Sequence, residues 1–155
     1  MEVLFFVLIV LSTFFLMEGV AWLTHKYVMH GFFWNLHDDH HNKEKSFFEK
    51  NDLFFVIFAL PSCICIMFGV WNESSISLAI GIGIALYGLG YFLVHDIFIH
   101  QRFRIFTKSD NVYLRAIRKA HKIHHKSLRK EEGECFGMLF VPIKYFVEAY
   151  NTRKA

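Results

Sequence analysis

The sequence predicts an all-α integral membrane protein, with three or four transmembrane helices and a histidine-rich helical cap on the cytoplasmic side of the bilayer. Hydrophobic residues make up 54% of the 155 residues, and only two residues are proline. Three long apolar segments interrupt the polar sequence, and ten histidines gather in four clusters outside them. This length suits one domain, and we expect a single membrane-bound domain over residues 1–155.

The three apolar segments predict the transmembrane helices. The segments are Val3–Leu23, Leu53–Trp71 and Ile76–Val94. Each is long enough, at about 1.5 Å per residue, to cross roughly 30 Å of hydrocarbon. Glu18 is the one charged residue inside them. The first segment has no basic region before it and no small-residue cleavage site, so we expect a retained helix rather than a cleaved signal peptide.

The distribution of basic residues predicts the orientation. If each segment crosses the bilayer once, Asn72–Ser75 form a turn on the far side and all four histidine clusters lie on one face. Of the 17 lysines and arginines, four lie in residues 24–52, ten in 95–134 and three in 135–155. The positive-inside rule makes the histidine face cytoplasmic. We expect this charge to orient the chain and to contact anionic lipid rather than to bind nucleic acid.

The last apolar stretch, Phe136–Tyr150, fits three different structures. It is short and contains Pro142, Lys144 and Glu148, which is compatible with a kinked fourth span, a re-entrant hairpin or an interfacial helix. A cytoplasmic basic C-terminus favours the re-entrant or interfacial structure.

The histidines repeat two spacings, H-x4-H and H-x2-H-H, and each spacing occurs twice in the same order. On an α-helix, H-x2-H-H places three imidazoles within about a 100° arc, whereas two histidines five apart lie about 140° apart. The recurrence of both spacings indicates a metal site, and ten imidazoles exceed what one ion binds, so a two-metal centre is predicted. No catalytic side chain beyond the metal ligands is predicted. The candidate ligands are His25, His30, His37, His40, His41, His95, His100, His121, His124 and His125.

Two short helices outside the bilayer are expected to carry the H-x2-H-H clusters. Asn35 is the expected N-cap of the first, and Ser109 or Asp110 that of the second. The second helix has an inward stripe made of Leu114, Ile117, His121, His124 and Leu128. We expect its remaining face to contact solvent or lipid headgroups. The alternative is that this face docks an acidic electron-transfer partner. That face consists of Arg115, Arg118, Lys119 and Lys122.

Two carboxylates are candidates for orienting an imidazole N–H. Glu18 lies seven residues before His25, and Asp96 lies four residues before His100. Small residues in the third span predict close helix packing, and their missing side chains also fit a slot for a long, rigid apolar substrate. These small residues are Ala79, Gly81, Gly83, Ala85, Gly88 and Gly90.

The motifs limit the chemistry. The sequence has no Glu-x-x-His, which excludes the carboxylate-rich di-iron bundle as a template, and no HExxH motif of zinc proteases. A nitrogen-only site binds iron or zinc. Because the bilayer supplies apolar substrates, the sequence suggests O2-dependent hydroxylation or desaturation of a lipid.

The histidine clusters, in this order and topology, resemble those of the membrane-bound fatty acid hydroxylase and sterol desaturase superfamily, and in detail its bacterial beta-carotene hydroxylase branch. The resemblance covers nearly the whole chain apart from its C-terminal end. The segments that carry it are residues 25–31 (HKYVMHG), Trp34 with 37–41, 48–53 (FEKNDL), 91–96 (YFLVHD), 100–102 (HQR), 120–125 (AHKIHH) and 133–140 (GECFGMLF).

The resemblance implies a non-haem di-iron mono-oxygenase of the bacterial inner membrane that hydroxylates the β-ionone rings of beta-carotene, giving beta-cryptoxanthin and zeaxanthin. It implies two iron ions (Fe2+), O2, a carotenoid taken from the bilayer, and electrons from an external ferredoxin and reductase. The chain has no dinucleotide-binding fingerprint, which agrees with an external donor. One alternative is a hydroxylase or desaturase of a sterol, a fatty acid or another carotenoid. A membrane metal carrier is less favoured, because a carrier should place ligands along a path across the bilayer, whereas every histidine here is expected on one side.

Overall fold

The computed structural model describes residues 2–42 and 47–154, and every regular element in these two ranges is helical. The order of elements confirms the predicted all-α architecture. The elements are α1 (Val3–Leu23), η1 (Thr24–Phe32), α2 (Trp34–His41), α3 (Asp52–Trp71), α4 (Ser75–Phe92), η2 (Leu93–Ile99), α5 (Val112–His124), η3 (Lys130–Glu132) and α6 (Ile143–Lys154).

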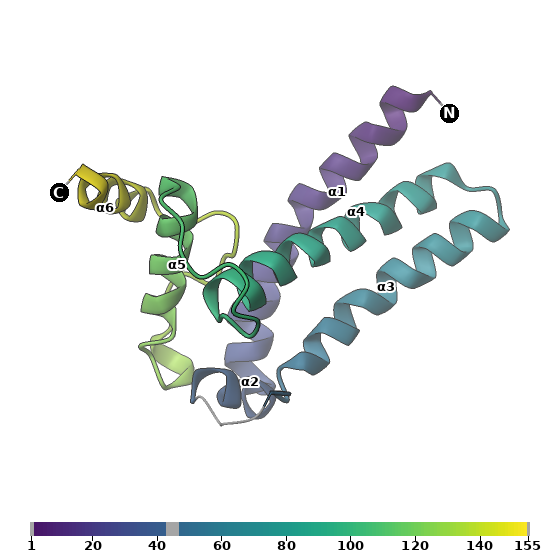
Figure 1. Ribbon diagram of the computed structural model, residues 1–155. Coiled ribbons are helices and arrows are strands. Elements are labelled where there is room, and N and C mark those ends of the chain that lie inside the picture. The colour runs from purple at the N-terminus through teal and green to yellow at the C-terminus, as the bar shows by residue number, and fades with distance from the viewer. Residues whose placement is uncertain (1, 43–46, 155) are drawn as a thin grey trace.

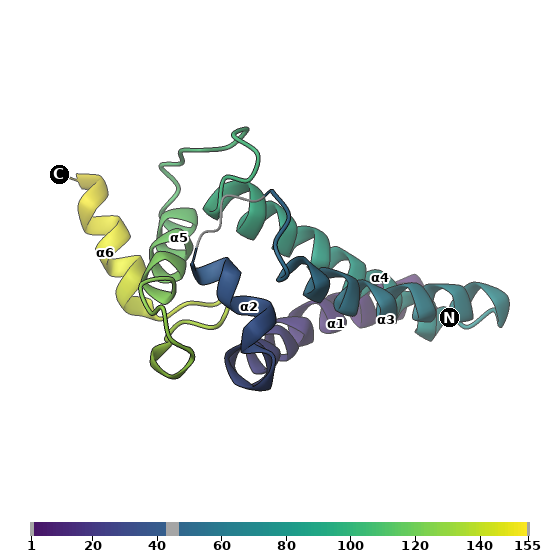
Figure 2. The same cartoon turned by 90° about the horizontal axis from the view of Figure 1, so that it is seen from below.

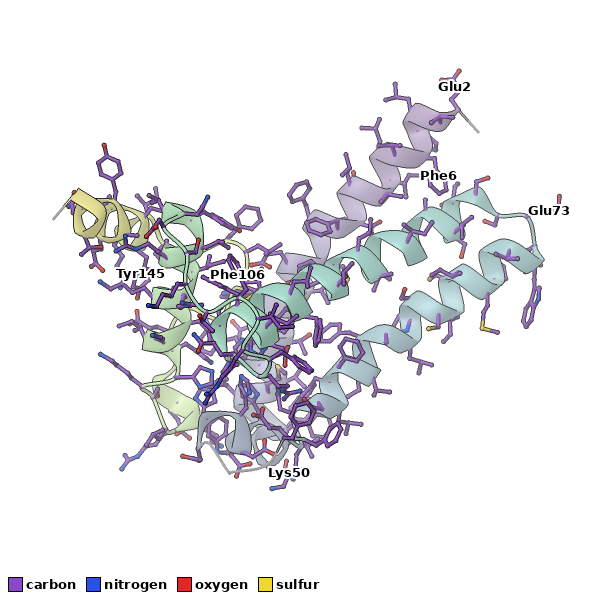
Figure 3. The ribbon with its side chains drawn as sticks, in the orientation of Figure 1. Glu2, Phe6, Lys50, Glu73, Phe106 and Tyr145 are labelled. Atoms are coloured by element: carbon purple, nitrogen blue, oxygen red, sulfur yellow. The ribbon has the colours of Figure 1, made fainter. Side chains whose placement is uncertain are left out.

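Three helical segments of the described chain are long and apolar enough to cross a membrane. They are Val3–Phe32, Asp52–Trp71 and Ser75–Ile99, which confirms the three predicted spans and extends the first and third into η1 and η2. Figure 1 shows α3 and α4 running antiparallel, with the turn between them at the same end as the N-terminus. Exposed Glu2 and Glu73 mark this end, and Lys50 lies at the opposite end (Figure 3).

Glycines explain how closely the three spans pack. A Cβ added at Gly81 would lie 2.8 Å from the Ile66 nitrogen of α3, and one at Gly83 would lie 2.8 Å from the Val10 carbonyl oxygen of α1. Each glycine therefore lets a neighbouring helix approach α4 at a distance that a side chain would prevent, so the packing interpretation is correct for these two. Gly88 differs, because a Cβ added there would meet no atom within 4 Å.

The cap is built on α5 and α6, which pack side by side beyond the bundle (Figures 1 and 2). Their shared core consists of Ala116, Ala120, Tyr145 and Ala149. The twelve residues of α6 span about 18 Å, too short for a membrane crossing. A kinked fourth span is therefore wrong, and Phe136–Tyr150 instead forms an extended strap followed by a helix on the cap.

Both predicted N-caps were wrong by one or two positions. Helix α2 begins at Trp34, because η1 runs to Phe32 and leaves only Phe33 between the two helices, so Asn35 lies inside the helix. Helix α5 is capped by Asn111, whose side chain accepts from the Leu114 N–H at 3.2 Å. The Ser109 hydroxyl instead accepts from the N–H of Asn111, the N-cap residue itself.

The basic face of α5 is only partly the solvated surface that the sequence suggested, because Lys119 and Lys122 are exposed whereas Arg115 and Arg118 are partly buried. Arg115 donates to Thr152 and Lys119 pairs with Glu148, both on α6. Arg118 stacks 3.7 Å above the Phe98 ring and donates to backbone carbonyls of the 98–107 segment. These three cations join α5 to its neighbours, although Lys119 is itself exposed. Leu128, expected in the inward stripe, is 59% exposed because α5 ends at His124.

Candidate metal centre

The two H-x4-H pairs lie in π-helical turns, which the sequence did not predict. In η1 the Phe33 N–H donates to the Val28 carbonyl, and in η2 the His100 N–H donates to the His95 carbonyl, each closing an i→i+5 bond. This wider turn brings residues five apart onto one side of the helix. The His95 and His100 rings are consequently 4.4 Å apart, centroid to centroid, and those of His25 and His30 are 5.2 Å apart.

The histidines meet at one end of the bundle in two adjacent groups. The five-histidine cluster consists of His25, His30, His37, His41 and His124, and the four-histidine cluster of His40, His95, His100 and His121. Within each, one ligand atom per residue lies within 4.8 Å of all the others. The tenth, His125, points its Nε2 to within 2.8 Å of His121 Nε2, beside the four-histidine cluster.

Helices α2 and α5 contribute to both clusters, whereas each π-helical turn contributes to one. Both histidines of η1 belong to the five-histidine cluster, and His95 of η2 and His100, the C-cap of η2, belong to the four-histidine cluster. In α2 the spacing sends His37 and His41 to one cluster and His40 to the other. In α5, His124 belongs to the five-histidine cluster and His121 to the four-histidine cluster. One helical face therefore serves two neighbouring sites.

Seven of the imidazoles have an oxygen acceptor at Nδ1. His25, His30, His41 and His124 donate to the backbone carbonyls of Phe136, Lys130, Ser127 and Glu134, at 2.8–3.1 Å. His37 donates to the Asn51 amide oxygen at 2.7 Å. His40 and His95 donate to the carboxylates of Glu49 and Asp96, at 2.7 and 3.1 Å. A carbonyl can only accept, so Nδ1 carries the proton and the Nε2 lone pair points inward.

The inward Nε2 atoms lie at the spacing expected of ligands around one cation. The pairs His25–His37, His30–His124 and His40–His95 have Nε2 atoms 3.1, 3.3 and 3.0 Å apart. Two nitrogens that both present lone pairs cannot hydrogen bond to each other. Metal–nitrogen bonds of about 2.1 Å place neighbouring ligand nitrogens about 3.0 Å apart in an octahedron and about 3.4 Å apart in a tetrahedron. The donor set and its spacing therefore fit a divalent metal ion in each cluster.

Burial keeps the imidazoles outside the spans neutral. Desolvation and, to a smaller extent, neighbouring histidines lower the pKa of His37 and His125 to about 2, that of His124 to about 3 and that of His41 to about 4. The neutral form is the one that binds a metal. No deprotonation therefore opposes metal binding near pH 7.

These pKa values predict acid sensitivity of the metal-free protein. Below about pH 6.5 the histidines of the unfolded chain take up protons that the folded chain does not, so the free energy of unfolding falls as the pH falls. We expect the chelator-treated protein in detergent to melt at a clearly lower temperature at pH 5 than at pH 7.5, with little change above pH 7.5. A melting temperature that stays flat from pH 7.5 to pH 5 would contradict the buried, neutral state.

The two carboxylates singled out in the sequence have different partners. Asp96 accepts from the Nδ1 of His95, its neighbour in the chain, at 3.1 Å. Glu18 contacts no imidazole in its described hydrogen bonds. It accepts from the Tyr87 hydroxyl at 2.7 Å and from the backbone N–H groups of residues 138–140 at 2.8–3.1 Å. It thereby anchors the strap whose Phe136 carbonyl holds His25.

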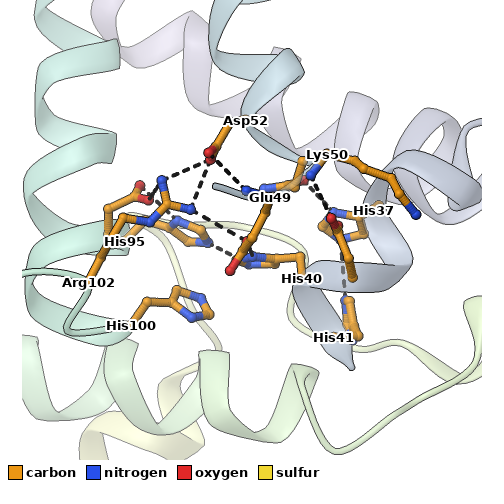
Figure 4. Close-up of polar contacts among 12 residues, drawn as sticks. His37, His40, His41, Glu49, Lys50, Asp52, His95, His100 and Arg102 are labelled. Atoms are coloured by element: carbon orange, nitrogen blue, oxygen red, sulfur yellow. Dashed lines mark hydrogen bonds and ion pairs between the residues drawn. The ribbon is translucent and has the colours of Figure 1, made fainter. Parts of the chain in front are cut away.

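Four further residues of the centre were missed: Glu49, Asn51, Asp52 and Arg102. Arg102 reaches Asp52, Asp96 and Glu49 at 2.9, 3.4 and 3.6 Å and so links the carboxylates behind His40 and His95 (Figure 4). Burial raises the pKa of the Glu49 carboxyl to about 7, and the Arg102 guanidinium opposes this rise. All four lie in segments 48–53 and 100–102, which carry the family resemblance, but their separation in the sequence gave no sign that they contact one another.

An apolar cavity of about 370 Å³ leads from the centre into the bundle. His25 and His95, one from each cluster, lie in its wall together with Tyr91, Phe136 and Met138. A second cavity of about 420 Å³ continues it between α3 and α4. The two cavities share lining residues, namely Phe55, Phe58, Tyr87, Gly88 and Phe92. The metal centre therefore faces an apolar passage inside the membrane span.

Comparison with known proteins places this centre in a family. The family model described as fatty acid hydroxylase matches residues 10–147. The chain belongs to the fatty acid hydroxylase family. The matched range includes all ten histidines, the Glu49–Arg102 network and both cavities.

Within this family, the chain is similar to several beta-carotene hydroxylases. The chain is 42% identical over 135 residues to the beta-carotene hydroxylase of Pantoea ananas, covering 87% of this chain and 77% of the relative. It is 40% identical over 136 residues to that of Pseudescherichia vulneris, covering 86% and 75%. The chloroplastic beta-carotene 3-hydroxylase 1 of Arabidopsis thaliana is 33% identical over 129 residues, covering 81% of this chain and 41% of the plant protein. No solved structure matches the chain.

Proposed function

We propose that this protein is a beta-carotene 3-hydroxylase, a di-iron mono-oxygenase that adds hydroxyl groups to β-ionone rings and forms beta-cryptoxanthin and then zeaxanthin. The observation that carries the proposal is the passage that ends at both histidine clusters. A ring entering it from the bilayer would reach His25 and His95 while its polyene stayed between α3 and α4. The similarity to beta-carotene hydroxylases over most of the chain supports the same substrate.

Iron is the metal that the proposed reaction needs. Nitrogen ligands alone suit iron and zinc, but zinc has no redox chemistry and cannot take part in reducing O2. Bound iron would supply the redox capacity to activate O2 with two electrons. The chain's own contribution is to orient seven imidazoles through their Nδ1 partners and to surround the reacting ring carbon with apolar walls that exclude water.

The partners and the location follow from the chemistry and the charge. The electrons would come from a ferredoxin-type donor and its reductase, because the sequence contains no dinucleotide-binding fingerprint. The basic residues gather near the histidine end, which supports insertion in the bacterial inner membrane with the metal centre on the cytoplasmic side.

Pigment analysis in living cells tests the proposed function. A bacterium that makes beta-carotene and expresses this chain should accumulate zeaxanthin, with beta-cryptoxanthin as the intermediate. The matched control is the same strain expressing the His124→Ala variant, which should keep its beta-carotene. Unchanged beta-carotene with wild-type protein present in the membrane, and with iron, O2 and reductase supplied, would contradict the carotenoid assignment and favour a sterol or fatty acid substrate.

A further inference from the structure

The hydrogen bonds behind the two clusters differ in charge. Every Nδ1 acceptor of the five-histidine cluster is neutral, being one of four backbone carbonyls or the Asn51 amide. Both acceptors identified for the four-histidine cluster are carboxylates, Glu49 for His40 and Asp96 for His95. A carboxylate behind an imidazole raises its basicity and its strength as a metal ligand, whereas a carbonyl does so much less.

The carboxylates are held in place rather than left to move with solvent. Arg102 lies within 3.6 Å of both, and it also donates two hydrogen bonds to Asp52 at the start of α3. The side chains of Glu49 and Asp96 are 21% and 16% exposed, so water does not screen them fully. The network joins the start of α3 to η2 beside the four-histidine cluster (Figure 4).

The backbone turn after η2 is shaped for this network. Gln101 has a φ of 55°, in the left-handed region that costs energy for a residue with a side chain. The turn lets the Arg102 N–H donate to the Asp96 carbonyl at 2.9 Å, which returns the guanidinium toward the carboxylates. Strain at one residue therefore places Arg102 beside the metal ligands.

We propose that Glu49 and Asp96, fixed by Arg102, are positioning residues for one metal only, so that the two metal sites of this protein are chemically unequal. The ion of the four-histidine cluster depends on the anionic partners of its imidazoles. The ion of the five-histidine cluster depends on four neutral backbone carbonyls within residues 127–136 and on the Asn51 amide. This inference rests on metal binding and not on the identity of the substrate.

Mössbauer spectroscopy with chelator competition separates the two sites. The full-length chain is purified, loaded with 57Fe2+ without O2 and titrated with a chelator. The wild type should hold about two irons and show two different quadrupole doublets. Glu49→Gln keeps a hydrogen-bond acceptor but removes the charge, and Asp96→Asn does the same. Each should lower the affinity of one site about 10-fold to 100-fold, so that one doublet disappears first.

The matched variant is Asn51→Ala, which removes a neutral partner from His37 and should weaken the other doublet. A variant that still binds one iron must be folded, because each cluster needs side chains from both α2 and α5. A single doublet in the wild type would overturn the inference, and so would loss of both doublets together in Glu49→Gln and Asp96→Asn. Since no carotenoid is present, a failed pigment experiment would leave this result standing.

Discussion

Replacing His124 or His40 by alanine should abolish hydroxylation while the protein still inserts in the membrane. The two residues represent the two clusters, and both are almost completely buried with Nε2 facing other histidines. Loss of either removes a ligand from one metal, and we expect activity to fall at least about 100-fold, or about 2.7 kcal/mol in the barrier. The measurement is zeaxanthin formed per milligram of membrane-inserted protein.

The matched control for this pair is Lys122→Ala. Lys122 lies on the same helix, two residues before His124, but is exposed and faces away from the clusters. Its replacement should leave activity within about twofold, because exposed surface changes have small effects. A His124→Ala protein that kept more than about a tenth of the wild-type rate, a change below about 1.4 kcal/mol, would show that this imidazole is not a metal ligand.

Replacing Gly88 by leucine should stop the reaction in a different way, with the metals still bound. Gly88 lines both cavities where they join, and no atom lies within 4 Å of an added Cβ. A leucine side chain would therefore fill the passage without disturbing the helix packing. We expect at least about a tenfold loss of hydroxylation, about 1.4 kcal/mol in the barrier, with an unchanged iron content.

Gly19→Leu provides the control for that substitution. Gly19 lies on α1, is exposed, and also has no atom within 4 Å of an added Cβ, but it lines neither cavity. The same change in helix propensity and size is thus made on the lipid-facing surface. Full activity of Gly88→Leu, or equal losses in both variants, would contradict the passage as the route of the substrate.

The spans and the gathering of the histidines could be predicted from the sequence because both depend on local patterns. Three apolar runs with at most one charge predict the three spans. Because two histidine clusters follow the first span and two follow the third, three crossings bring all four clusters to one end. The shared face of each H-x2-H-H was predicted from helical spacing, but its division between two clusters was not.

The rest depended on contacts between distant residues or on rare backbone geometry. An H-x4-H pair looked weak because α-helical spacing separates its members, and only the π-helical turns of η1 and η2 bring them together. His25 and its acceptor Phe136 are 111 residues apart. Glu18 looked like a partner for His25 by spacing, but the strap folds back and saturates it with backbone N–H groups. No periodicity encodes such a return of the chain.

Oxygen-isotope labelling tests most directly whether this centre hydroxylates a carotenoid ring with O2. The purified, iron-loaded protein in lipid nanodiscs is given beta-carotene, a ferredoxin with its reductase, and 18O2 in unlabelled water, and the products are examined by mass spectrometry. We predict zeaxanthin whose two hydroxyl oxygens are both 18O, with no product when O2 is withheld. Hydroxylated product carrying oxygen from water, or turnover that continues without O2, would contradict the proposed mono-oxygenase.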